Sequence, residues 1–173
     1  MTLILGLGNP LRGDDGIGPR VAAELLQRGL PDSVGARDAG AAGLDLLNLL
    51  DGPQRVIVVD AADVGLTPGQ FARFTPDDAH LADAADTFSF HSAGLAEALA
   101  LARALGRPLP EIVIFGVQPG STGWGEELSP PVEDAVPRVV EAVLKEVETS
   151  QTRRVSRKPF GSGSEAIFRA RRK

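Results

Sequence analysis

Short apolar runs alternate along this chain with segments in which apolar residues recur every three or four positions. Three runs are apolar almost throughout, at residues 3–7, 56–60 and 111–117. Such runs are typical of strands that are buried on both faces of a parallel sheet. A shorter strand is predicted at 34–38, and residues 69–74 are expected to form a short edge strand or hairpin arm.

Helical periodicity fills the gaps between these runs. It predicts helices at 15–28, from Gly43 to about residue 50, at 92–105, and over a valine-rich stretch from 132 to 147. The last helix either kinks at Pro137 or begins there. Residues 75–90 are polar and acidic, and they are expected to form a long loop. The order of elements predicts an α/β three-layer sandwich with a largely parallel twisted sheet and helices on both faces.

Composition places these elements in one domain. The chain has 173 residues, and we assign 1–149 to the folded domain and 150–173 to a basic C-terminal tail that we expect to be disordered. Residues 153–173 contain eight Lys or Arg and one acid, although the whole chain has a net charge of −5. The body is therefore strongly acidic, which argues against nucleic acid and membrane surfaces as partners.

Features that the sequence lacks exclude several classes of protein. The chain has no cysteine, which excludes disulfides, thiolate metal sites and a cysteine nucleophile. No stretch has the length and character of a signal peptide or a membrane span, so a cytoplasmic location is expected. The glycine-rich turn lacks the third glycine of a dinucleotide site. Walker, zincin and nucleophile-elbow patterns are also absent from the sequence.

Three side chains follow or end predicted strands at one edge of the sheet. Asp15 lies in the glycine-rich turn after the first strand, Asp60 ends the strand at 56–60, and His91 precedes a predicted helix. Ligands of such sheets bind at the carboxyl ends of the strands. Two carboxylates and an imidazole suit a divalent transition metal. The alternative is that each has a local role: Asp15 as a helix cap, Asp60 as an acceptor for backbone amides, and His91 as a helix-entry residue.

Three other residues are weaker candidates. His80 lies in the acidic loop, where a solvated role is expected. Asp38 either helps to seat a ligand or caps the turn beside Gly40. Trp124, the only tryptophan, either anchors a partner protein or packs over the sheet edge.

The glycine-rich turn also resembles the opening motif of a known family. It reads GLGNPLRGDDGIG over residues 6–18 and is similar to that of the hydrogenase maturation proteases. The resemblance continues in order through DAGAAG (38–43), VVDA (58–61), HSAGL (91–95), FGVQP (115–119) and LSP (128–130). It covers about residues 3–147. Members often have Asp-Gly-Gly-Thr after the second strand, where this chain has Asp38-Ala39-Gly40-Ala41.

The resemblance implies an endopeptidase that removes the C-terminal extension of a nickel-iron hydrogenase large-subunit precursor after nickel insertion. It implies that Asp15, Asp60 and His91 bind metal, and that the nickel is carried by the substrate. We hypothesise an aspartic-type mechanism in which Asp15 or Asp60 activates a water while the metal or His91 positions the carbonyl. We expect the enzyme to act as a monomer.

Two rival functions remain. One is a chaperone or metal-binding module that holds the immature subunit without cutting it, since binding and cleavage would use the same residues. The other is a peptidyl-tRNA hydrolase, a class that also begins with a strand and Gly-Leu-Gly-Asn-Pro. That class needs a histidine in the first turns and a basic face, and this chain has Asp14-Asp15 and an acidic body instead.

Overall fold

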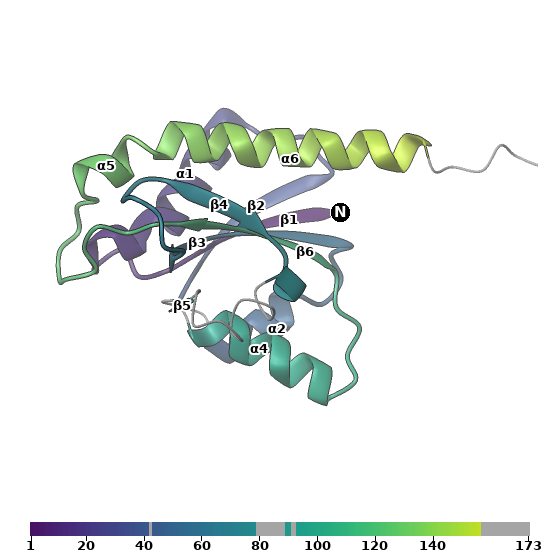
Figure 1. Ribbon diagram of the computed structural model, residues 1–173. Helices are drawn as coiled ribbons and strands as arrows, with labels where there is room; N and C mark the ends of the chain where they lie inside the picture. Colours follow the sequence, from purple (N-terminus) through teal and green to yellow (C-terminus); the bar gives the residue numbers. More distant parts are fainter. Residues whose placement is uncertain (42, 79–88, 91–92, 157–173) are drawn as a thin grey trace, which may run out of the picture.

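A mixed, mostly parallel sheet forms the centre of the molecule. The computed structural model describes residues 1–41, 43–78, 89–90 and 93–156. The sheet has the order β2-β1-β3-β6-β4, in which β1, β2, β3 and β6 run parallel and β4 runs antiparallel to β6 (Figure 1). These strands are β1 (Thr2–Leu7), β2 (Val34–Gly40), β3 (Arg55–Asp63), β4 (Phe71–Phe74) and β6 (Glu111–Val117).

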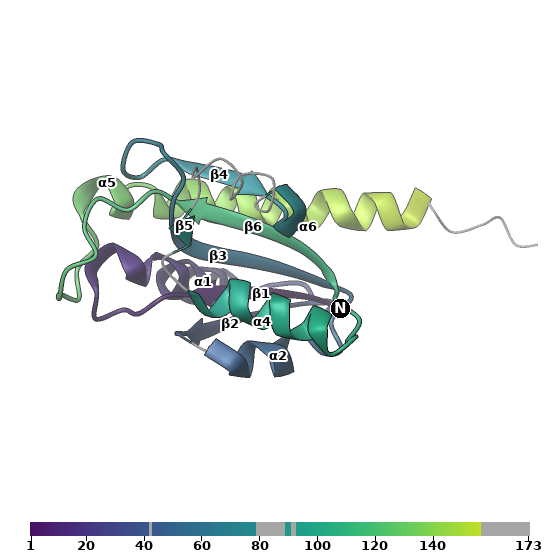
Figure 2. The ribbon, with the colours of Figure 1, turned by 60° about the horizontal axis from the view of Figure 1, so that its bottom comes forward.

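Helices cover both faces of this sheet. Helices α1 (Ile17–Arg28), α5 (Pro130–Glu133) and α6 (Val136–Ser156) lie on one face, and α2 (Leu46–Leu49) and α4 (Ala93–Ala104) lie on the other (Figures 1 and 2). The strands alternate between two cores, which is the pattern of a sheet buried on both sides. In β3, Ile57 and Val59 pack with α1 and α6, whereas Val56 and Val58 pack with α4. The predicted three-layer sandwich is therefore confirmed.

Several element boundaries differ from the sequence-based expectations. Strand β3 continues to Asp63, so Asp60 lies inside the strand rather than at its end. A short strand, β5 (Ser89–Phe90), pairs with this extension, where a loop was expected. Helix α6 begins at Val136 and has Pro137 in its first turn. Of the two expectations for Pro137, a kink or a helix start, the structure therefore shows the helix start.

The last helix also extends beyond its expected end near residue 147. Helix α6 continues to Ser156, into the segment 150–173 that composition predicts to be a disordered tail. The apolar positions Val143 and Val147, which precede this segment, pack on the sheet. Residues 157–173 lie outside the described residues. Within the described ranges, no helix combines the length and apolar character needed to cross a lipid bilayer.

Helix α1 approaches the carboxyl ends of β1 and β3 unusually closely. A Cβ added to Gly18 would lie 2.1 Å from the Leu7 carbonyl oxygen and 2.5 Å from the Val59 carbonyl oxygen. A Cβ added to Gly6 would lie 2.1 Å from the Gly18 carbonyl oxygen. Both positions therefore require glycine. This contact brings the turn before α1 against the edge of the sheet where ligands of such folds bind.

Substitution of Gly18 by alanine tests this close contact. We expect Gly18→Ala to lower the free energy of unfolding by about 3 kcal/mol or more, because backbone atoms cannot move aside for the new methyl group. Gly35→Ala is the matched control, since its added Cβ would lie 3.4 Å from Leu3 Cδ1 in ordinary contact. Urea denaturation of both variants measures the difference, and equal midpoints would contradict the prediction.

Candidate active site

The first turn after β1 presents the first candidate carboxylate. Asp15 lies in the 3-10 helix η1 (Gly13–Gly16) and is partly buried. Its Oδ2 accepts a hydrogen bond from the Asn9 backbone N–H at 2.8 Å. Gly8 has a φ of +120°, and a Cβ at Gly8 would lie 1.8 Å from the Asp15 carbonyl oxygen. Asp15 therefore folds back against the end of β1. The N-cap of α1 is Gly16, and no side-chain hydrogen bond caps this helix.

Asp60 supplies the second candidate carboxylate from inside the sheet. It is fully buried in β3 and pairs in register with Gly116 of β6. By strand alternation it shares the face of Val58 and Ala62, which pack in the core beneath α4. Because η1 contacts β3 directly, the backbones that carry Asp15 and Asp60 lie at the same end of the sheet.

His91, the third candidate, lies outside the described residues. The residue before it, Phe90, pairs with Ala62, two positions after Asp60. Helix α4 begins two residues after His91, at Ala93. Within the described residues, no group of three His, Cys, Asp or Glu is arranged to hold a metal ion. A metal site that includes His91 therefore stays a prediction.

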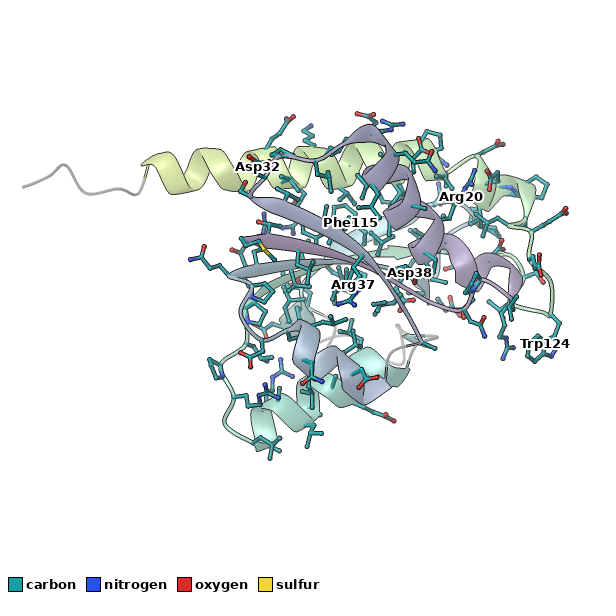
Figure 3. The ribbon with its side chains drawn as sticks, turned by 180° about the vertical axis from the view of Figure 1, so that it is seen from behind. Arg20, Asp32, Arg37, Asp38, Phe115 and Trp124 are labelled. Atoms are coloured by element: carbon teal, nitrogen blue, oxygen red, sulfur yellow. The ribbon has the colours of Figure 1, made fainter. Side chains whose placement is uncertain are left out.

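The structure describes two of the three other candidate residues, Asp38 and Trp124. Asp38 is exposed, and its Oδ1 accepts a hydrogen bond from the Gly40 N–H at 2.8 Å, which is the capping role, at the end of β2. Its role in seating a ligand stays a prediction. Trp124 is 82% exposed at the outer end of its loop, so the alternative in which it packs over the sheet edge is wrong. Figure 3 shows both residues, with Trp124 pointing away from the body of the molecule. His80 lies outside the described residues.

Asp14, the neighbour of Asp15, anchors a distant loop, a role that its position in the sequence does not indicate. Its side chain is fully buried and accepts four hydrogen bonds from a loop more than a hundred residues away. The donors are the N–H groups of Gly120 (2.7 Å), Ser121 (2.8 Å) and Ser129 (2.6 Å), and the Ser129 hydroxyl (2.8 Å). A carboxylate provides enough acceptor positions for all four. Asp14 therefore ties the loop of residues 120–129 to the turn that carries Asp15.

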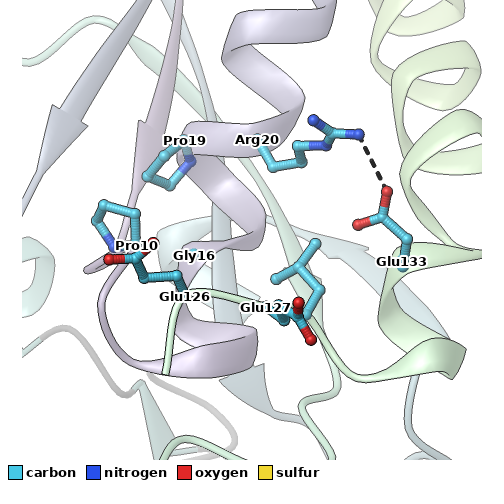
Figure 4. Close-up of a pocket in the computed structure, with 8 residues that line it drawn as sticks. Pro10, Gly16, Pro19, Arg20, Glu126, Glu127 and Glu133 are labelled. Atoms are coloured by element: carbon cyan, nitrogen blue, oxygen red, sulfur yellow. Dashed lines mark hydrogen bonds and ion pairs between the residues drawn. The ribbon is translucent and has the colours of Figure 1, made fainter. Parts of the chain in front are cut away.

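A cleft opens beside this turn. Its volume is about 510 Å³, and Figure 4 shows the residues that line it. One wall comes from the first turn and α1, and the other from the loop and α5; the lining residues are Pro10, Gly16, Pro19, Arg20, Glu126, Glu127, Leu128 and Glu133. Arg20 pairs with Glu133 at 3.0 Å, which leaves the exposed Glu126 and Glu127 to make the cleft acidic.

The fold and this edge of the sheet together define a class of protein. It is a three-layer α/β protein in which an acid-bearing glycine turn lies beside a buried strand aspartate. The family model described as hydrogenase maturation protease matches residues 19–146, which include Asp60 and His91 and begin just after Asp15. The chain belongs to the hydrogenase maturation protease family.

Individual relatives agree with this assignment. The chain is 39% identical over 136 residues to the hydrogenase expression/formation protein HupD of Bradyrhizobium diazoefficiens, covering 78% of this chain and 71% of the relative. It is 34% identical over 146 residues to HupD of Rhizobium leguminosarum, covering 83% and 72%. Among solved structures, it is similar to the hydrogenase maturating endopeptidase HybD from E. coli, with a TM-score of 0.73 and 34% identity over 86% of this chain and 93% of that one.

Proposed function

We propose that this chain is an endopeptidase that removes the C-terminal extension from the large-subunit precursor of a nickel-iron hydrogenase after nickel has been inserted. Membership of the hydrogenase maturation protease family carries this proposal. The site is consistent with it, because the turn that carries Asp15 and the strand that carries Asp60 meet at one edge of the sheet. We also propose the cytoplasmic location that is expected from the sequence.

Asp15, Asp60 and His91 are the residues that we assign to the chemistry. One carboxylate takes a proton from a water molecule as the water attacks the scissile carbonyl carbon. The peptide C–N bond then breaks, and the proton passes to the departing amine. Positioned acid–base groups of this kind contribute about a hundredfold to ten-thousandfold in rate. His91, with the metal of the substrate, positions the carbonyl in this proposal.

The metal in this proposal is part of the substrate. Two carboxylates and an imidazole make a small oxygen and nitrogen ligand set without thiolates, and such a set binds nickel only moderately. Moderate affinity suits recognition of nickel that is already held by the precursor, because a tight site would remove it. Asp15 and Asp60 supply the charge for this recognition, and His91 supplies the nitrogen ligand.

The alternative is a protein that holds the precursor without cleaving it. One experiment distinguishes this function from the proposed endopeptidase activity. Purified protein is incubated with candidate nickel-loaded precursors, and the mobility of each precursor is followed by gel electrophoresis and size-exclusion chromatography. The proposed function predicts that one precursor shifts to higher mobility and is released. An unchanged precursor that co-elutes stably with the protein would show a holding function instead.

A further inference from the structure

The structure also indicates a surface on which the substrate docks. We propose that Leu11, Arg12 and Trp124, which we call the aromatic platform, form the contact for the folded large-subunit precursor beside the scissile segment. This inference rests on the proposed function, since it names the partner of the same site. It concerns affinity for the precursor and assigns no part of the chemistry to the platform.

Two exposed large hydrophobic side chains, Leu11 and Trp124, lie on neighbouring segments at this point of the molecule. Trp124 is 82% exposed and Leu11 is 50% exposed, although both are large hydrophobic side chains. The Arg12 guanidinium carbon lies 5.6 Å from the centre of the Trp124 ring, in a cation–π contact. Tryptophan and arginine are the residues most enriched among the energetic anchors of protein interfaces. An exposed Trp with an Arg against its ring therefore has the chemistry of a docking site.

The platform is held in place by buried and backbone hydrogen bonds. Asp14 binds both ends of the loop that carries Trp124, through Gly120 and Ser121 at one end and Ser129 at the other. The Gly13 N–H donates to the Gly125 carbonyl at 2.7 Å, and the Gly125 N–H donates to the Leu11 carbonyl at 3.0 Å. These bonds fix the loop while leaving Trp124 exposed. A preorganised aromatic side chain loses little conformational entropy when a partner covers it.

The position of the platform points to the substrate as its occupant. The Asp15 N–H donates to the Arg12 carbonyl at 3.1 Å, so the platform and the candidate catalytic carboxylate belong to one turn. A protein docked on Trp124 therefore lies against the turn that carries Asp15. An enzyme that cleaves a folded precursor needs such a contact, because a short scissile segment alone buries too little surface for a specific complex.

The charge around the aromatic platform indicates which kind of precursor surface would bind to it. Glu126 and Glu127 follow Trp124 in the same loop, and both are exposed on the rim of the acidic cleft. The complementary surface carries an apolar side chain flanked by Lys or Arg. A second copy of this chain fits poorly, because two copies meeting at this loop would bring four like-charged glutamates together.

Steady-state processing of a nickel-loaded precursor tests the platform. We expect Trp124→Ala to raise KM at least tenfold and to leave kcat within about twofold, because the side chain contributes to binding alone. Leu105→Ala is the matched control, since Leu105 is also a large exposed hydrophobic residue, at 61% exposure, and lies just beyond α4. An unchanged KM for Trp124→Ala, with processing by the wild type intact, would overturn the platform and leave the proposed function standing. Failure of the wild type to process any precursor would overturn the proposed function itself.

A binding measurement that needs no cleavage provides the second test. Trp124 is the only tryptophan of the chain, so labelling with 5-fluorotryptophan gives a single ¹⁹F resonance. We expect this resonance to shift and saturate as the nickel-loaded precursor is added, and Glu126→Gln/Glu127→Gln to weaken the titration and reduce its salt dependence. A resonance that does not move with the precursor, or that moves only with the concentration of this chain, would overturn the proposal.

Discussion

Asp60→Asn is expected to reduce precursor processing by at least a hundredfold. Asparagine keeps the volume of the fully buried Asp60 side chain and removes its charge. Loss of a positioned carboxylate that activates water costs about a hundredfold to ten-thousandfold in rate. The mass of the precursor, followed over time with purified variant, measures the effect, and circular dichroism checks that the variant is folded.

Asp63→Asn is the matched control for this substitution. Asp63 ends the same strand, is exposed, and accepts a hydrogen bond only from the nearby Gly65 N–H at 3.2 Å among the described contacts. We expect this variant to process the precursor at the wild-type rate. Processing by Asp60→Asn at the wild-type rate would show that the buried strand carboxylate has no part in the reaction.

Asp14→Ala is expected to destabilise the protein by about 3 kcal/mol or more. The substitution leaves three backbone N–H groups and the Ser129 hydroxyl without their buried acceptor, and each orphaned donor costs about 1–3 kcal/mol where water cannot reach it. Because the same bonds hold the loop of residues 120–129, we also expect the KM for the precursor to rise. Urea denaturation measures the stability, and processing kinetics measure KM.

Two milder variants are expected to lose less stability than Asp14→Ala. Ser129→Ala removes the 2.8 Å hydroxyl bond and keeps the three backbone bonds, so a loss of about 1 kcal/mol is expected. Asp14→Asn replaces one acceptor oxygen by a donor that faces other donors, so its stability should fall between those of Ser129→Ala and Asp14→Ala. Equal stability of Asp14→Ala and the wild type would contradict the assignment of Asp14 as the anchor of the loop.

The three-layer sandwich could be predicted because the spacing of apolar residues in each strand and helix indicates which of its faces are buried. The run at 56–60 is apolar on both faces, and β3 is buried on both faces in the structure. The valine spacing of the last helix matches the side of α6 that packs on the sheet, where Val136, Val139, Val140 and Val143 are buried. Local periodicity reports local burial, and this part of the fold depends on little else.

Features that depend on distant contacts could not be predicted in this way. Asp14 and Asp15 are adjacent and chemically alike, and only the folded chain shows that Asp14 is buried against residues 120–129 while Asp15 faces the end of β1. Strand β5 forms because its two residues pair with the extension of β3. The spacing of apolar residues in the sequence gives no sign of this pairing. The exposure of Trp124 likewise follows from the loop anchored by Asp14, and the sequence left that residue open between two roles.

The role of nickel and the cleavage itself are tested most directly by one comparison. The wild-type protein is incubated with the same large-subunit precursor in nickel-loaded and nickel-free forms, and the released peptide is identified by mass spectrometry. We expect a single C-terminal peptide from the nickel-loaded precursor and none from the nickel-free form. Release of the same peptide at equal rates from both forms would contradict recognition of substrate-borne nickel, and release from neither would contradict the endopeptidase assignment.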